Sequence, residues 1–137
     1  MITKIDLMRH RLEQARECLN IAETIVDAST KTAANRSYYC IFHAMRAVLA
    51  LDEFDSKKHS GIISYFRQNY IKTGKFNADF SNTIGKAFEI RGDSDYQDFY
   101  VVSKQDVLEQ IENAKRFLEA VEGYLNTLSE VEKHALS

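Results

Sequence analysis

The chain has 137 residues, 45% of them hydrophobic, and a formal net charge of -2, which suits a single domain over residues 1–137. No run of about 18 uncharged apolar residues occurs, and the early charges Asp6 and Arg11 interrupt any signal-peptide apolar region, so we expect a soluble cytoplasmic protein without a membrane segment. Cys18 and Cys40 do not form a Cys-x-x-Cys pair, and we interpret both as buried apolar side chains.

The first predicted helix runs from about Asp6 to Asp27. Its apolar residues recur at alternating steps of four and three, which places them in one stripe along a helix. Thr3, followed three residues later by Asp6, predicts a capping box at its start. His10 lies on the opposite, charged face, where we expect no function. The stripe consists of Met8, Leu12, Ala15, Leu19, Ala22 and Val26.

The second predicted helix follows hydroxyl residues that would cap it, and from Ala33 to Leu49 it is apolar on nearly every side. We therefore expect it to be the central helix of the domain. Arg36 and His43 are seven residues apart, so on a helix they share one face, about 10.5 Å apart along the axis, with Tyr39 between them. These polar residues indicate either a polar site or a structural hydrogen-bond network in the core.

Ser56 is the predicted cap of a short third helix that extends through Tyr70. Lys57, Lys58 and His59 lie near its start, where free backbone N–H groups and added positive charge would favour an anion such as phosphate.

Gly74 is expected to end the third helix. A fourth helix is predicted from Ala78 to Ile90, with Gly92 as a left-handed C-cap. Residues 93–102 are expected to form a surface loop, because the pattern there is the least helical of the chain.

The last predicted helix begins at Ser103, with Asp106 three residues later, and its tail at 129–137 is expected to fray. It repeats the stripe pattern of the first helix. The stripe consists of Val107, Ile111, Ala114, Leu118, Val121, Leu125 and Leu128. Together the elements predict an all-α, mainly antiparallel bundle of about five helices.

Charge is distributed unevenly along the chain. Residues 31–91 carry a net charge of +5 and residues 92–137 a net charge of -6. A basic middle would suit phosphate, and an acidic last helix would face solvent or a partner. The alternative is that both are ordinary solvated faces.

Three blocks resemble, in order and spacing, the small stand-alone HEPN domain proteins of bacteria and archaea. They read NRSYYCIFHAMRAVL at 35–49, KHSGIISYFRQNYIKTGKF at 58–76 and KAFEIRGDSDYQDFY at 86–100. The resemblance implies a helical bundle that forms homodimers and is encoded beside a minimal nucleotidyltransferase. It also implies, for many members, a metal-independent ribonuclease that acts in toxin-antitoxin or defence systems.

The ribonuclease signature of this family is an Arg followed, after four to six residues, by a His, with the motifs of two subunits lining one cleft. Arg36 and His43 fit the upper limit, and Ser37 matches the polar residue that commonly follows the Arg. In ribonuclease members the motif generally lies later, after the position of Arg91, where this chain has no nearby His.

Our first hypothesis is RNA cleavage, in which His43 acts as the base, Arg36 binds the phosphate and Tyr39 supports them. A homodimer would repeat each of these side chains and so supply a second histidine. No metal or cofactor is expected, since the four histidines match no zinc or di-iron spacing.

The competing hypothesis is a non-catalytic module that binds a nucleotide, RNA or a nucleotidyltransferase. The resemblance matches Arg91, Asp95 and Tyr96 to the Arg and Asp-Tyr positions of the family block, and the Lys57 to His59 segment would add phosphate contacts. In some HEPN toxins the partner modifies a loop Tyr with a nucleotide, a position that Tyr96 loosely resembles. A purely structural dimerisation domain is a third alternative.

Overall fold

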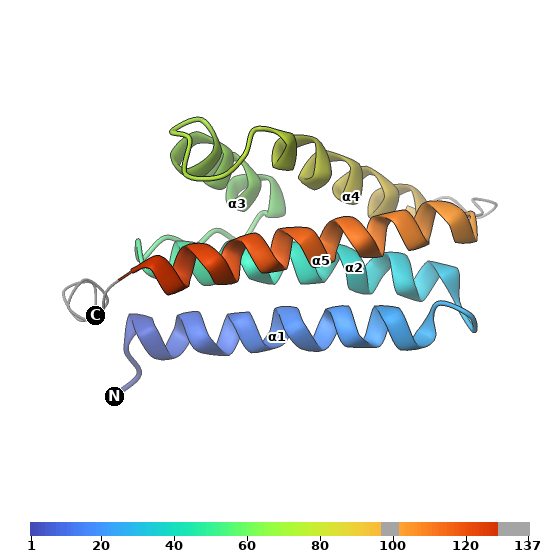
Figure 1. The fold of residues 1–137 in the computed structure, drawn as a ribbon, viewed down its shortest axis with the longest axis horizontal. Coiled ribbons are helices and arrows are strands. Elements are labelled where there is room, and N and C mark those ends of the chain that lie inside the picture. Colours follow the sequence, from blue (N-terminus) through green and yellow to red (C-terminus); the bar gives the residue numbers. More distant parts are fainter. Residues whose placement is uncertain (97–101, 129–137) are drawn as a thin grey trace.

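The computed structural model describes residues 1–96 and 102–128, and it describes the side chains of 1–92 and 102–128. The described part contains five α-helices and one π-helical segment, with no strand, which confirms the predicted all-α fold (Figure 1). In chain order these are α1 (Lys4–Ile25), α2 (Thr30–Ala50), α3 (His59–Phe66), η1 (Arg67–Ile71), α4 (Asp79–Tyr96) and α5 (Lys104–Thr127).

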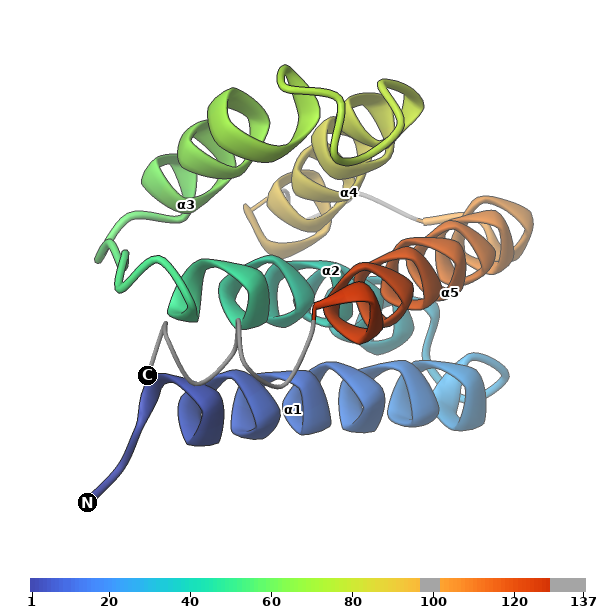
Figure 2. The same ribbon diagram turned by 60° about the vertical axis from the view of Figure 1, so that its left-hand side comes forward.

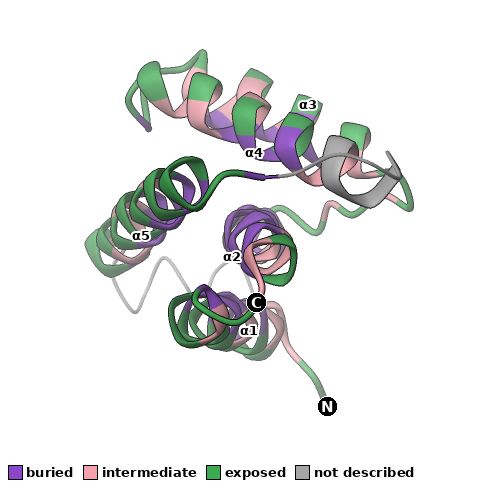
Figure 3. Cartoon of the chain, turned by 90° about the vertical axis from the view of Figure 1, so that its right-hand side faces the viewer, coloured by how far each residue is buried: buried purple, intermediate pink, exposed green. Residues whose placement is uncertain are grey.

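The three longest helices, α1, α2 and α5, lie side by side, and α3 and α4 lie on the side of α2 opposite α1 (Figure 2). Helix α2 contacts each of the other four α-helices. Seen end-on, it is buried along most of its surface (Figure 3). The prediction that the apolar stretch from Ala33 to Leu49 is the central helix is confirmed, so any polar residue on α2 must be paired or face a cleft.

Three predicted helix starts are confirmed. Thr3 and Asp6 form a reciprocal capping box, with distances of 3.1 Å from the Asp6 N–H to Thr3 Oγ1 and 3.0 Å from the Thr3 N–H to Asp6 Oδ2. Ser29 caps α2, and Ser103 caps α5, each by accepting from a backbone N–H three residues later at 3.1 Å. Such a cap satisfies a backbone donor that the helix itself leaves unpaired.

The prediction that Ser56 caps the third helix is wrong. Helix α3 begins at His59, and its N-cap Lys58 makes no side-chain cap hydrogen bond. The Ser56 hydroxyl instead accepts from the Lys58 N–H at 3.2 Å, so it stabilises the loop before the helix. Gly74 does end this region as predicted, with a φ of +83°.

The predicted C-cap at Gly92 is also wrong, because α4 continues to Tyr96 and Gly92 does not adopt a positive φ. The end of α4 is held by Arg91, whose guanidinium lies over the rings of Tyr38 and Tyr39 on α2. This packing favours helix over the loop expected from residue 93. Residues 97–101 of that loop, and the tail at 129–137, lie outside the described residues.

Both cysteines are buried, as expected from the sequence, with exposed fractions of 6% for Cys18 and 0% for Cys40. Burial raises the pKa of each thiol above its ordinary value. Both thiols therefore remain protonated near neutral pH and act as small apolar side chains.

Candidate active site

Tyr39 is the centre of a group of charged and aromatic side chains drawn from three helices. It lies on α2, half-buried, at the surface where α3 and α4 approach. The centre of its ring is within 6 Å of two guanidinium groups and two imidazole rings. We call Tyr39 and these four residues the Tyr39 cluster. The other four members are Arg36 and His43 from α2, His59 from α3 and Arg91 from α4.

Arg36 and His43 flank Tyr39 along α2, at positions three residues before it and four after it, so all three share one helix face. The Arg36 guanidinium lies 5.2 Å from the Tyr39 ring centre, and the His43 ring lies 5.8 Å from it. Arg36 donates two hydrogen bonds to the neutral amide oxygen of Asn35, from Nε at 3.0 Å and from Nη2 at 2.6 Å. No carboxylate in the described part forms an ion pair with Arg36, so its charge is available to an anion.

His43 is held in its neutral form. Burial, together with the nearby cations Arg46 and Arg36, lowers the pKa of His43 from 6.5 to about 4. Its Nδ1 is buried and has no hydrogen-bond partner among the described residues. A neutral imidazole retains an unprotonated nitrogen at pH 7 and is chemically able to accept a proton.

His59, the first residue of α3, brings a second imidazole to the cluster. Its ring is edge-on to Tyr39 at 5.8 Å and stacks on Phe42 at 4.1 Å. Its Nδ1 is 2.7 Å from the Tyr38 hydroxyl. Burial raises the pKa of Tyr38, so this phenol keeps its proton and can donate a hydrogen bond to Nδ1 in the tautomer of His59 that carries the ring proton on Nε2. Burial, with Arg91 and Arg46 nearby, also lowers the pKa of His59.

Arg91 connects α4 to the cluster. Its Nη2 is 3.4 Å from the Tyr39 hydroxyl, and its guanidinium lies 5.8 Å from the Tyr39 ring centre and 5.6 Å from that of Tyr38. Arg91 was expected in a nucleotide-binding group, and the fold places it against the Arg36 and His43 face.

The remaining sequence candidates are not brought into the cluster by described contacts. Lys57 and Lys58 are exposed in the segment before α3, while their neighbour His59 turns inward. The side chains of Asp95 and Tyr96 lie outside the described part of the structure, although both residues belong to α4.

Three residues near the site were not anticipated from the sequence. Tyr38 and Phe42, one turn apart on α2, hold the His59 ring, and Arg46 lies 5.8 Å from the Phe42 ring centre. The sequence signal for them was present, since aromatic residues at a spacing of four on an apolar helix form one surface. That surface predicts a partner ring from elsewhere in the chain but cannot say which one.

The cluster therefore combines two guanidinium groups, two neutral imidazoles and a phenol on one surface. Guanidinium groups bind phosphate through paired hydrogen bonds, and a neutral imidazole offers one nitrogen as acceptor and the other as donor. This set of groups suits a phosphodiester. The described residues contain no group of three metal-ligating side chains, and no helix among them is long and apolar enough to cross a bilayer.

Comparison with known proteins gives a family match over most of the chain. A model of the HEPN domain matches residues 8–124. A UPF0332 protein of Thermotoga maritima is 30% identical over 129 residues, which cover 93% of this chain and 98% of that protein. A protein of Methanocaldococcus jannaschii named "Putative toxin MJ0142" is 27% identical over 115 residues, covering 83% of this chain and 78% of its own.

Proposed function

This chain belongs to the HEPN family, and from that premise we propose that it is a metal-independent endoribonuclease of the toxin or defence kind. The observation that carries the proposal is the convergence of Arg36, His43, His59 and Arg91 on the ring of Tyr39. The relative named as a toxin supports the biological setting. We place this activity in the cytoplasm.

In the proposed reaction, neutral His43 accepts the proton of a ribose 2'-hydroxyl as its oxygen attacks the adjacent phosphorus. The bond to the 5'-oxygen of the next nucleotide breaks, which leaves a 2',3'-cyclic phosphate and a 5'-oxygen that takes up a proton. Arg36 and Arg91 stabilise the negative charge that grows on the phosphate oxygens. Water supplies the proton that the leaving 5'-oxygen takes up, and a ring N–H of His59 would donate a hydrogen bond to that oxygen.

We further propose that the active form is a homodimer and that a minimal nucleotidyltransferase is its partner. A two-fold interface repeats every side chain, so two Tyr39 clusters would face one RNA strand. The family resemblance implies both associations. The expected readouts are a mass of two chains in solution and inhibition of cleavage by the co-expressed partner.

The decisive experiment is cleavage of total RNA by the purified protein in EDTA, compared with an Arg36→Ala, His43→Ala double variant. We expect cleavage by the parent and a loss of at least about 100-fold in the double variant, in line with the usual contribution of a general base. The matched control removes the same two side-chain types from the exposed surface of α1, as Arg9→Ala, His10→Ala. Equal cleavage by the parent and the folded Arg36, His43 variant would refute the assignment.

One observation favours a second function, a module that binds nucleotide or RNA without cleaving it. The pKa of His43, at about 4, is well below 7 and makes its imidazole a weak base. Two guanidinium groups hold a phosphate without any proton transfer. If the parent cuts no RNA yet a nucleotide raises its melting temperature, and the double variant loses that protection, the binding function is the correct one.

A further inference from the structure

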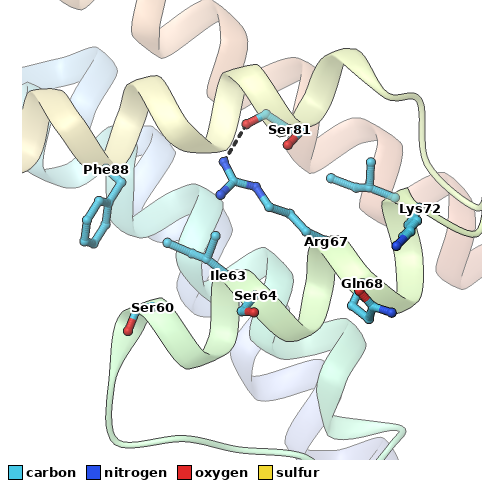
Figure 4. A pocket seen from close by; sticks show the side chains of 9 residues that line it. Ser60, Ile63, Ser64, Arg67, Gln68, Lys72, Ser81 and Phe88 are labelled. Atoms are coloured by element: carbon cyan, nitrogen blue, oxygen red, sulfur yellow. Dashed lines mark hydrogen bonds between the residues drawn. The ribbon is translucent and has the colours of Figure 1, made fainter.

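A cavity lies between α3–η1 and α4, outside the Tyr39 cluster. Its volume is about 480 Å³, within the usual range of small-molecule sites. Figure 4 shows its side chains, with Arg67 reaching from η1 across to α4. The lining residues are Ser60, Ile63, Ser64, Arg67, Gln68, Ile71, Lys72, Ser81 and Phe88.

The lining is positively charged. It includes two cations, Arg67 and Lys72, and no carboxylate. The Arg67 Nη2 donates to the backbone oxygen of Ser81 at 2.9 Å, while its Nε is buried with no partner among the described residues. In the part of the chain that the structure describes, neither Arg67 nor Lys72 forms an ion pair. The Lys72 ammonium and the remaining Arg67 N–H groups that line the cavity are donors for an anion there.

The π-helical segment η1 explains why these side chains share one face. In an α-helix, each residue is rotated by about 40° around the helix axis relative to the residue four positions before it, so a row of such residues drifts away from one face. In η1 the Lys72 N–H instead bonds the Arg67 oxygen five residues back, at 2.8 Å, and this wider turn offsets the drift. Gln68 and Lys72 therefore stay above Ser64, on the cavity side. Single π turns of this kind occur frequently at functional sites.

Gly85 on α4 provides the space that Arg67 needs. A Cβ atom at this position would lie 3.0 Å from Arg67 Nη2, closer than an ordinary contact. Because glycine has no Cβ, the guanidinium can lie directly against α4 and reach the Ser81 oxygen. The close approach holds the guanidinium in place within the cavity.

Phe88 adds an exposed aromatic ring to the cavity, on the opposite side of Arg67 from Lys72 (Figure 4). It is 40% exposed, although a large apolar side chain, and it lines the cavity. Behind it, the Tyr38 ring lies 6.1 Å away. An aromatic ring supported from behind and adjacent to positive charge is a suitable surface for stacking a nucleobase whose phosphate is held nearby.

We propose that this cavity binds a nucleoside phosphate, with the phosphate on Arg67 and Lys72 and the base against Phe88. The hydroxyls of Ser60 and Ser64 supply further donors to the phosphate oxygens. This is a site separate from the Tyr39 cluster, and it goes beyond the proposed cleavage activity. A free nucleotide and one nucleotide of an RNA strand present the same chemistry to it.

The test measures binding of AMP, by calorimetry, to the full chain and to variants shown to be folded. Lys72→Ala should weaken AMP binding about tenfold, the usual effect of losing one hydrogen bond to a charged group. Phe88→Ala should weaken it at least about fivefold through lost stacking. Lys115→Ala on α5 removes the same charge from an exposed position outside the cavity and should leave the affinity unchanged. Inorganic phosphate should compete with AMP, and adenosine should compete less well.

Two outcomes would overturn the proposal. The first is AMP binding that neither Lys72→Ala nor Phe88→Ala weakens, or no AMP binding by the parent. The second is loss of AMP binding in the folded Arg36→Ala, His43→Ala variant, which would place the nucleotide at the Tyr39 cluster instead. Retained binding in that variant supports the separate site even if the parent cleaves no RNA.

A final comparison distinguishes the two sources of the ligand. A 2'-O-methylated RNA trinucleotide cannot undergo attack by a 2'-hydroxyl and so serves as an uncleaved strand. If it binds more tightly than AMP, and Lys72→Ala weakens it, the cavity holds part of an RNA. If AMP binds as tightly or more tightly, the ligand is a free nucleotide.

Discussion

The Tyr38 hydroxyl and the Nδ1 of His59 lie 2.7 Å apart, although the two residues are separated by 21 positions in the chain. This hydrogen bond joins the central helix to the start of α3. It also fixes which nitrogen of His59 is presented to the Tyr39 cluster. The same contact therefore contributes to the fold and to the orientation of an imidazole in the candidate site.

We expect Tyr38→Phe to destabilise the protein by about 1 kcal/mol, the usual value of one hydrogen bond, and to lower its melting temperature by about 2–5 °C. The variant retains the aromatic ring and its stacking, so the change in stability measures the contribution of the hydroxyl alone. Tyr39→Phe is the matched control, because among the described residues its hydroxyl makes one long contact, 3.4 Å from Arg91 Nη2. Thermal unfolding measures both, and an equal effect of the two variants would contradict the assigned role of the Tyr38 hydroxyl.

Stability should depend on the protonation of His43 between about pH 4 and 6.5. Its pKa is about 4 when folded and near 6.5 when unfolded, so in this range the unfolded chain binds more protons and acid favours unfolding. The free energy of unfolding should therefore rise with pH from 4 to 6.5, and above that His43 should contribute no further change. His59, whose pKa is also lowered, acts in the same direction.

His43→Gln should flatten this pH dependence while keeping a polar side chain of similar size. Urea unfolding at pH 4.5 and pH 7 measures the difference in stability for each protein. His10→Gln, at an exposed position on α1, should retain the dependence of the parent. An undiminished pH dependence in His43→Gln would mean that another group is responsible.

Asp55 should stabilise the fold by pairing with two arginines. Its Oδ2 lies 3.4 Å from Nη2 of Arg11, which is only 6% exposed, and 3.1 Å from Nη2 of Arg46. We expect Asp55→Asn to cost about 1 kcal/mol, because it leaves a nearly buried cation without its counter-charge. Asp27→Asn removes an exposed pair with Lys104 and should cost less than about 0.5 kcal/mol. Chemical denaturation at pH 7 compares them.

Gln110 on α5 is a stability defect that substitution should relieve. It is 2% exposed, and neither its amide nitrogen nor its amide oxygen has a hydrogen-bond partner among the described residues. Gln110→Met keeps the length of the side chain and removes the unpaired groups, so we expect a gain of about 1–2 kcal/mol. Gln105→Met, at an exposed position on the same helix, should be nearly neutral. A loss of stability in Gln110→Met would indicate that a buried water satisfies the amide.

The fold was largely predictable because its helices carry strong periodic patterns and local caps. Thr3, Ser29 and Ser103 act through backbone groups only a few residues away, which the sequence displays directly. The predictions failed where tertiary contacts, rather than local sequence, determine where a helix ends or how it winds. Helix α4 passes Gly92 because Arg91 is held against α2, and no local signal marks the π turn of η1.

The arrangement of the candidate site was predictable only where its residues share one helix. Arg36, Tyr39 and His43 lie on a single face of α2, so their spacing alone places them together. His59 and Arg91 reach the same surface through the packing of α3 and α4, and this depends on the whole fold. The sequence grouped His59 with Lys57 and Lys58 because they are neighbours in the chain, whereas a helix start directs adjacent side chains to different sides.

The burial of both cysteines makes the molecule convenient for site-directed labelling. Thiol reagents attack thiolates, and the raised pKa and low exposure of Cys18 and Cys40 protect them in the folded state. A cysteine introduced at an exposed site such as Lys115 would therefore react first with a maleimide dye. Energy transfer between donor- and acceptor-labelled copies would then report self-association directly, without any need to remove the native cysteines.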